Sequence, residues 1–305
     1  MSSLDKEKLI DALVRQIKIS VTTLPDDIKT AIRKAYERER HPVAKKILSS
    51  IIDNFNLSEY DGIPMCQDTG TITWFLKVGK DFPLLTSLEE ILVEATRRAT
   101  KMVPIRPNAV DPFTGKNSGD NTGRFIPWIN WEIVDGDEAE ITVLPKGGGS
   151  EYTAQLHMVS PGLGVKGIKE AVLKTVYEAG GKPCPPIIVG VGIGGGADIA
   201  MKLGKLALLR PITIRHENPD VAKLEEELLN ELNQLGIGPM GLGGDTTVLG
   251  VNIEYAHRHP ATLPVGVVTQ CWAARRASIK VFSNGDIEVL SHKIPNILDI
   301  RLRGE

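Results

Sequence analysis

The chain has 305 residues, of which 42% are hydrophobic and 24% charged, and its formal net charge is −2 at pH 7. These values are ordinary for a soluble globular protein, and the balanced charge argues against a nucleic-acid binder, which would carry a basic face. No apolar run approaches the ~18 residues of a membrane span, and the polar start of the chain does not resemble a signal peptide. We therefore expect a cytoplasmic protein of one or two domains, without a membrane or nucleic-acid partner.

The N-terminal part of the chain has the pattern of helices. Apolar residues recur with the 3.6-residue period over residues 9–17, which predicts a first helix. Two prolines, the first followed by two aspartates, predict the starts of two further helices. A capping-box pattern precedes a fourth helix. The residues that carry these signals are Pro25, Pro42, Ser87 with Glu90, and, at the end of the fourth helix, Met102.

Beyond about residue 105 the pattern changes to strands mixed with helices. Asp135-Gly136 lies between two runs of alternating apolar residues, which predicts a hairpin, and Asn218-Pro219 predicts the start of a long helix that ends near Gly236. Buried or alternating strands are expected over residues 187–193, 246–255, 263–270 and 278–290, the last with a turn at Asn284-Gly285. The sequence thus predicts a mixed α/β (α+β) fold: a helical subregion over about 1–105, then a mixed α/β subregion over about 106–305, with a soft boundary near 105–125.

Four segments are rich in glycine and polar residues and are too long for ordinary turns. They cover residues 64–71, 105–123, 145–151 and 238–250. Glycine is needed where the backbone must approach a ligand closely, and binding residues are concentrated on loops. One such loop would be a plain surface connection, but four together favour a site for a polar small molecule.

The three cysteines, Cys66, Cys184 and Cys271, lie within or beside such loops or at the ends of expected strands. An odd, small number in a cytoplasmic chain is a poor disulfide framework, and the plain alternative is that each is a small buried apolar residue. Structural zinc would need paired C-x₂₋₄-C knuckles, which are absent, and catalytic zinc with three cysteines is unusual. An iron–sulfur cluster accepts thiolates at any spacing, and three of them would leave one iron open to act as a Lewis acid.

The run GVGIGGG matches G-x-G-x-x-G at Gly190, Gly192 and Gly195. A dinucleotide fold would need an acidic residue at the end of the next strand, where Glu217 is the candidate. The other interpretation is that these glycines allow close packing or direct helix amides toward an anion. The pattern alone favours the second interpretation.

Taken together, these segments resemble the class I fumarase family, which includes fumarate hydratases and L-tartrate dehydratases. The matching pieces are MCQDTGT, IRPNAVDPFTGKNSGDNTG, PKGGGSE, KPCPPIIVGVGIGG, GLGGDTTVLGVNIEYAHRHPATLPVGV and QCWAARRAS, in the family's order over about residues 40–280. A chain of this length looks like the α subunit. The resemblance implies a [4Fe–4S] cluster with one open iron, held by Cys66, Cys184 and Cys271.

The resemblance also implies further site residues. Gln67 would contact substrate and Asp68 would assist the catalytic base, although an aspartate there could equally cap the following turn. Arg106 would bind a carboxylate in a bidentate manner, a surface salt bridge being its plain alternative. A backbone amide at Gly149 would touch substrate. His259 would orient Asp68 or a substrate carboxylate, or move a proton itself.

The implied activity is reversible hydration of a small dicarboxylic acid, with fumarate and L-malate of the tricarboxylic acid cycle expected first and L-tartrate or a mesaconate-type acid as the alternative. Because the family's C-terminal part, which supplies the base, has no counterpart here, the chain is expected to need a separate β subunit in an α2β2 assembly. A redox iron–sulfur protein and a noncatalytic regulatory subunit are the alternatives from other classes.

Overall fold

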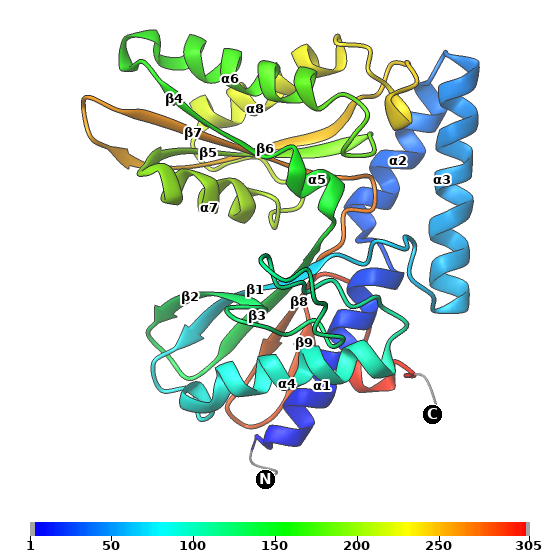
Figure 1. The fold of residues 1–305 in the computed structure, drawn as a ribbon, viewed down its shortest axis with the longest axis vertical. Coiled ribbons are helices and arrows are strands. Elements are labelled where there is room, and N and C mark those ends of the chain that lie inside the picture. Colours follow the sequence, from blue (N-terminus) through cyan, green and yellow to red (C-terminus); the bar gives the residue numbers. More distant parts are fainter. Residues whose placement is uncertain (1–3, 303–305) are drawn as a thin grey trace. The chain divides into compact units, whose positions relative to one another are not determined.

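The computed structural model describes residues 4–302 of the chain, which divides into two compact units. Unit 1 comprises Met1–Pro25, Phe55–Lys146 and Arg275–Glu305, and unit 2 comprises Asp26–Asn54 and Gly147–Ala274. Helices and mixed sheets occur in the chain as expected, which confirms the mixed α/β class (Figure 1).

Unit 1 is built on a five-stranded sheet in the order β2-β1-β3-β8-β9. Its elements are α1 (Lys6–Thr22), β1 (Thr71–Gly79), α4 (Leu88–Met102), β2 (Trp128–Val134), β3 (Ala139–Lys146), β8 (Ala277–Val281) and β9 (Ile287–Val289); α3 (Pro42–Asp61) lies across the boundary between the two units. The apolar sides of α1 and α4 share one core with β1, β3 and β8. The helices predicted from the apolar period and from Pro42 are therefore confirmed, as is the turn at Asn284-Gly285, which joins β8 to β9.

The hairpin predicted at Asp135-Gly136 is wrong. β2 pairs in parallel with β1, and β3 pairs antiparallel with β1, so β1 lies between the two strands that the turn connects. The turn crosses the end of β1, where the amide of Gly79 donates to the carbonyl of Glu138 at 2.8 Å. A side chain at Gly79 would come within 2.7 Å of the Asp137 amide nitrogen, so only glycine fits under this crossing.

The capping box predicted at Ser87 is also wrong, because its side chain makes no capping hydrogen bond. Ser87 has φ −106° and ψ −3°, which is helical rather than extended, and it ends a short 3₁₀ turn, Leu85–Ser87. A side chain caps the first helical amides only from an extended N-cap residue, so the turn replaces the cap.

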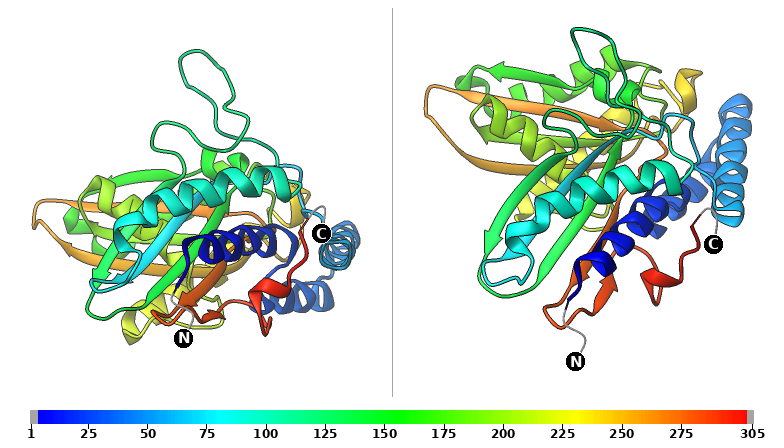
Figure 2. Two further views of the ribbon diagram at one scale, coloured as in Figure 1. Left: turned by 90° about the horizontal axis from the view of Figure 1, so that it is seen from below. Right: turned by 60° about the horizontal axis from the view of Figure 1, so that its bottom comes forward.

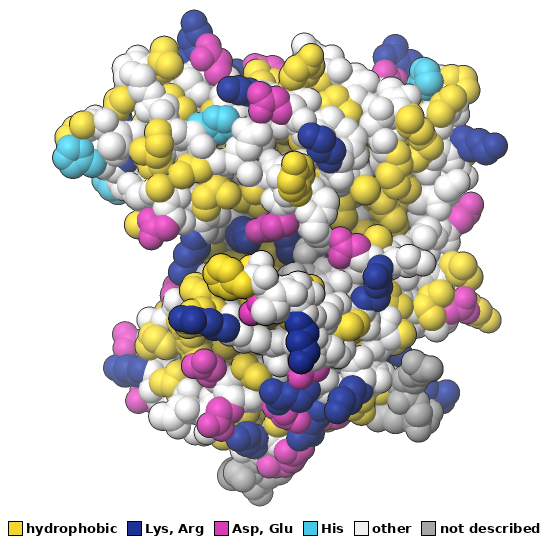
Figure 3. All heavy atoms as spheres, viewed as in Figure 1, with side chains coloured by type: hydrophobic (Ala, Val, Ile, Leu, Met, Phe, Trp, Pro, Cys, Tyr) yellow, Lys and Arg dark blue, Asp and Glu magenta, His cyan; other side chains and the backbone are white. Residues whose placement is uncertain are grey.

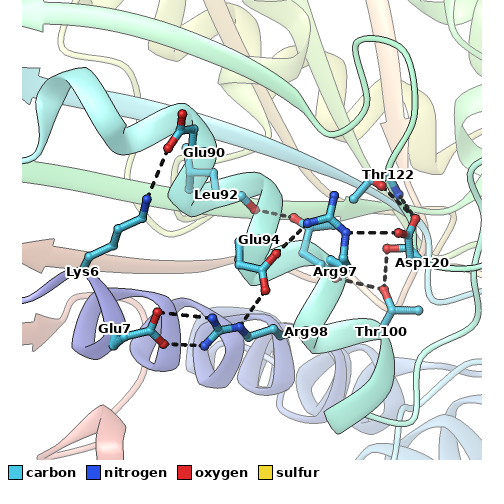
Figure 4. Close-up of polar contacts among 11 residues, drawn as sticks. Lys6, Glu7, Glu90, Leu92, Glu94, Arg97, Arg98, Thr100, Asp120 and Thr122 are labelled. Carbon is cyan, nitrogen blue, oxygen red and sulfur yellow. Dashed lines mark hydrogen bonds and ion pairs between the residues drawn. The ribbon is translucent and has the colours of Figure 1, made fainter.

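Ion pairs on the surface join α1 to α4 (Figure 4). Arg98 donates to both carboxylate oxygens of Glu7, at 2.6 and 3.3 Å, and to Glu94 at 2.8 Å. Glu94 also pairs with Arg97 at 2.6 Å. Hydrogen bonds from Arg98 and then Arg97 hold the pKa of the Glu94 carboxyl below its usual value. The two helices that cover the sheet are thus also tied along their outer sides.

Unit 2 contains a four-stranded sheet in the order β4-β7-β5-β6. Its elements are α2 (Asp26–Arg38), α5 (Gly148–Tyr152), β4 (Gln155–Val159), α6 (Gly164–Ala179), β5 (Ile187–Gly195), α7 (Ala197–Ala207), α8 (Pro219–Asn233), β6 (Val248–Arg258) and β7 (Leu263–Gln270). α6 and α8 cover one face of the sheet and α7 covers the other (Figure 1). The strands expected near residues 187–193, 246–255 and 263–270 are confirmed, and Asn218 caps α8 as predicted by accepting from the amide of Asp220 at 3.0 Å.

The glycines of the G-x-G-x-x-G pattern allow α7 to lie close against β5. A side chain at Gly192 would lie 2.5 Å from the amide nitrogen of Gly204 in α7, and one at Gly190 would lie 2.9 Å from Leu208. The dinucleotide interpretation required a strand that ends at Glu217, and residues 208–218 form turns and bends instead. The pattern in this chain therefore serves helix–sheet packing.

No helix within residues 4–302 is long and apolar enough to cross a membrane. Basic and acidic side chains are mixed over the face drawn in Figure 3, in keeping with the small net charge of −2.

Candidate active site

Two of the three cysteines meet at one end of the sheet of unit 2. Cys184 lies just before β5 and Cys271 just after β7, and because these strands run antiparallel, the start of one and the end of the other share an edge. The amide of Trp272 donates to the carbonyl of Cys184 at 3.2 Å, which fixes the two segments side by side. We refer to this end of the sheet, with Cys184 and Cys271, as the cysteine edge.

The glycine-rich segment 238–250 packs at the same edge. The amide of Met240 donates to the carbonyl of Pro185 at 2.7 Å, and the amide of Ile187 donates to the carbonyl of Thr247 at 2.9 Å. β6 runs parallel to β5, so the segment that enters β6 lies beside the segment that enters β5. The loop thus holds the backbone that directly follows Cys184.

A buried carboxylate holds this loop in turn. Glu39 is 2% exposed and accepts the amide of Asp245 on both carboxylate oxygens, at 3.1 and 3.0 Å. Arg40 donates to the Asp245 carboxylate at 2.8 and 2.9 Å, and these hydrogen bonds keep the pKa of Asp245 below its usual value. The connection between α2 and α3 therefore sets the path of the loop.

Gly149 lies next to the cysteine edge as well. A side chain there would lie 2.9 Å from the carbonyl oxygen of Lys182, two residues before Cys184. Glycine at this position is explained by that close backbone approach. Whether its amide touches a substrate remains a prediction.

The two cysteines form no disulfide, and they lie in different settings. Cys184 is exposed and has φ +54°, a left-handed conformation that is uncommon and costly for residues other than glycine, and strained residues of this kind are enriched at functional sites. Cys271 is half-buried, and its thiol donates to the carbonyl of Ala273 at 3.6 Å. The preceding side chain, Gln270, is 2% exposed, and neither its amide nitrogen nor its amide oxygen has a hydrogen-bond partner.

The third cysteine, Cys66, is a half-buried free thiol in unit 1, in the loop that leads into β1. The loop is anchored at its start, where the amide of Met65 donates to the carbonyl of Val21 at 3.1 Å. Gln67 is exposed. Asp68 Oδ1 accepts the amide of Gly70 at 3.1 Å, so the turn-capping role expected as the alternative for Asp68 is present.

Arg106 lies beside this loop in the same unit. Its amide donates to Thr69 Oγ1 at 3.0 Å, and its carbonyl accepts from the side chain of Asn121 at 3.0 Å. Arg106 and Asn121 belong to the long loop between α4 and β2, which projects from the unit (Figure 2). The Arg106 side chain is exposed, and its guanidinium forms no ion pair or hydrogen bond with residues 4–302, so the salt bridge considered as its alternative role is absent there.

His259 lies away from the cysteine edge. It belongs to the exposed connection between β6 and β7, at the end of β7 opposite Cys271, and its Nδ1 accepts the amide of Ala261 at 3.1 Å. Eight residues of strand separate the two positions, which corresponds to roughly 26 Å. A cavity of about 570 Å³ near His259 is lined largely by apolar residues, together with His257 and Arg258, and it too lies at that end of unit 2.

Within residues 4–302, no group of three or more histidine, cysteine, aspartate or glutamate side chains is arranged to hold a metal ion. The donor set nevertheless suits an iron–sulfur cluster, which binds thiolates: two cysteines that form no disulfide share one edge, and a third lies on a loop of unit 1. The unpaired, buried amide of Gln270 beside Cys271 is a second observation in favour, since such a group is rarely left without a partner. Sequence reasoning missed Gln270, although its position next to the third cysteine was a usable signal.

Comparison with known proteins gives the family. The family model described as fumarate hydratase (fumerase) matches residues 9–280. The chain is 48% identical to the putative L(+)-tartrate dehydratase subunit alpha of Methanocaldococcus jannaschii over 275 residues, covering 88% of this chain and 96% of the relative. It is 40% identical to the L(+)-tartrate dehydratase subunit alpha of Escherichia coli K12 over 297 residues, covering 96% and 98%. The chain therefore belongs to the fumarate hydratase (fumerase) family of hydro-lyases.

Proposed function

We propose that this chain is the α subunit of a [4Fe–4S]-dependent hydro-lyase that dehydrates L(+)-tartrate. The observation that carries the choice of substrate is the agreement of the relatives' names, at 48% and 40% identity over most of the chain. The first expectation from sequence, fumarate and L-malate of the tricarboxylic acid cycle, becomes the second candidate. It is favoured only by the description of the family.

Cys184 and Cys271 on the cysteine edge, together with Cys66, would hold the cluster. When bound, the cluster supplies an open iron, a Lewis acid that makes a hydroxyl group a better leaving group. The absence of a disulfide at all three cysteines and the left-handed conformation at the exposed Cys184 support this assignment. The unpaired amide of Gln270 supplies hydrogen-bonding capacity beside Cys271.

Residues of unit 1 would bind and orient the acid. Arg106 has an exposed guanidinium without a partner among residues 4–302, and its planar fork suits a substrate carboxylate. Gln67 is exposed and would hydrogen-bond substrate. Asp68 uses Oδ1 to hold its own turn, which fixes the carboxylate in place to assist the base that removes the proton. The amide of Gly149 in unit 2 would contact the substrate.

The partner would complete the site. The relatives are named α subunits, which implies a separate β subunit, and we propose an α2β2 assembly in which β supplies the base. Within unit 2, His259 is separated from the cysteine edge by the length of β7. For His259 to act on substrate, it must come from another copy of the chain in that assembly.

The test is to co-express the chain with its β subunit, reconstitute the cluster without oxygen, and assay L-tartrate and L-malate in parallel. Loss of water from tartrate yields an enol that becomes oxaloacetate, and loss of water from malate yields fumarate, so the products can be distinguished. We expect oxaloacetate from tartrate, no activity after Cys271→Ser or in air, and normal activity for Met158→Ser. The control replaces a sulfur-containing side chain that is 58% exposed on β4.

The alternative outcomes separate the other candidates. Fumarate formed from malate, with tartrate inert, would return the assignment to fumarate hydratase. A cluster-loaded complex that dehydrates neither acid would refute the hydro-lyase proposal. A redox or regulatory role would then be examined by measuring the cluster's reduction potential.

A further inference from the structure

Three buried cationic residues gather at one edge of the five-stranded sheet of unit 1. β1 starts, β3 ends and β8 starts at this edge, because β3 runs antiparallel to both of its neighbours. Lys146 ends β3, and Arg275 and Arg276 immediately precede β8; these side chains are 4%, 1% and 4% exposed. Fully buried lysine and arginine side chains are rare unless they are paired with an acid.

Arg275 stands out within this group. Its Nη1 donates to the backbone carbonyl of Asp68, which is a neutral acceptor, and its Nε is buried without a hydrogen-bond partner. Among residues 4–302 no carboxylate forms an ion pair with it. The structure therefore encloses a positive charge whose compensating negative charge is not supplied by the described part of the chain.

Arg15 in the same unit shows what a compensated case looks like. It is 7% exposed, and its Nη1 donates to the backbone carbonyl of Ile300, just as Arg275 does to that of Asp68. In addition its Nε pairs with the carboxylate of Asp11 at 3.0 Å. The two arginines thus differ in their counter-charge: Arg15 has a carboxylate partner, and Arg275 has none among residues 4–302.

A buried charge without a partner is costly, because the free energy of hydration that it loses is not offset by attraction to a nearby opposite charge. Three of the buried side-chain atoms without partners, Gln270 Nε2, Gln270 Oε1 and Arg275 Nε, lie within four residues of Cys271 in the sequence. Such groups therefore concentrate in the segment that carries a proposed cluster ligand. Unpaired buried groups in a native protein call for a functional explanation.

We propose that Arg275 is a positioning residue for an anion of the active site, and that the charge of this anion completes the pairing that the chain leaves open. This inference rests on the proposed function. The anion is either a carboxylate of the substrate or the negatively charged, thiolate-bound cluster. Through its bond to the Asp68 carbonyl, Arg275 also ties that anion to the loop that carries Gln67 and Asp68.

The experiment uses the α–β complex with Arg275→Met, which removes the charge at similar size, Arg275→Lys, which keeps it, and Arg15→Met as the matched control. We expect Arg275→Met to raise KM for L-tartrate, or to speed cluster loss in air, by roughly 10- to 100-fold, as for the loss of a hydrogen bond to a charged group. Arg275→Lys should recover part of the effect. A rise in KM identifies the substrate carboxylate as the anion, and faster cluster loss with KM unchanged identifies the cluster.

Thermal stability separates this role from a structural one. Arg15→Met should lower the melting temperature with KM and cluster lifetime unchanged, whereas Arg275→Met should not lower it in the cluster-free, substrate-free complex. If Arg275→Met instead behaves like Arg15→Met, the inference is wrong and the residue is structural. If the wild-type complex turns over no acid, the proposed function fails, and two other measurements then decide. Loss of the saturable thermal stabilisation by L-tartrate, or faster cluster loss in air, only in Arg275→Met supports the inference, and no change in either refutes it.

Discussion

Glu225 on α8 should be among the most costly side chains to remove from unit 2. It is fully buried, with 0% of its surface exposed. Its Oε1 accepts from Arg210 Nη2 at 2.6 Å and from the amide of Ile253 at 2.8 Å, and its Oε2 accepts from the amide of His216 at 3.2 Å. The carboxylate therefore joins α8, β6 and the irregular segment 208–218.

The magnitude follows from what each substitution leaves behind. Glu225→Ala leaves the partly buried guanidinium of Arg210, the buried amide of Ile253 and the partly buried amide of His216 without this acceptor, and breaking a buried ion pair costs about 3–5 kcal/mol. Glu225→Gln keeps the shape and one acceptor oxygen but loses the charge, so the cost should be nearer to that of one charged hydrogen bond, about 1.5–3 kcal/mol. Arg210 keeps a second acid, Glu254, at 3.3 Å, which places the expected values at the lower ends of these ranges.

Urea unfolding of the full chain, followed by circular dichroism, measures these changes. Glu227→Ala is the matched control, because Glu227 lies on the same helix but is 39% exposed and pairs with Lys169 at the surface. Surface ion pairs contribute little to stability, so the control should unfold close to the wild type. If Glu225→Ala is no less stable than Glu227→Ala, the reasoning from burial and pairing is refuted.

Three further predictions concern packing, pH and salt. Gly192→Ala should destabilise the chain by about 1–3 kcal/mol or more in calorimetry, because the added carbon would overlap the carbonyl oxygen of Ala200 in α7; an unchanged melting temperature would contradict the packing role. Burial lowers the pKa of His157 from 6.5, so the unfolded chain binds a proton that the folded chain excludes; stability should be complete above about pH 6.5 and fall as the pH drops below it, and His157→Gln should flatten this part of the profile. Glu94→Gln should cost less than about 1 kcal/mol, and the cost should shrink in high salt because the pair with Arg98 is at the surface; a cost that does not depend on salt would argue against an electrostatic origin.

Local signals in the sequence were sufficient where a few neighbouring residues decide the structure. Asn218 caps α8 through its own side chain, and Asn284-Gly285 closes a hairpin whose strands are adjacent in both sequence and space. Asp135-Gly136 carries the same kind of signal, yet its strands are separated by β1, which arrives from some 50 residues earlier in the chain. Turn chemistry specifies a reversal of the chain, but the order of strands depends on long-range packing.

In the candidate site too, sequence signals located some residues, and others could be recognised only from the packing. Glycine-rich loops and cysteine positions were enough to expect Cys66, Cys184 and Cys271 together; the structure places Cys184 and Cys271 on one edge, and the convergence of Cys66 with them stays a prediction. The position of His259 at the far end of β7 follows from strand direction, which the motif does not encode. Arg275 and Gln270 escaped notice because their significance is the absence of a partner, and an absence is visible only once the packing is known.

The place of β7 in its sheet has a consequence for how the enzyme matures. β7 is the last strand of unit 2 to be synthesised, yet it lies between β4 and β5 rather than at an edge. Cys184 and Cys271 become neighbours only after this final strand has inserted, since no shorter segment of the chain brings them together. The proposed cluster would therefore find both of these thiols together only after the whole of unit 2 has been translated and folded.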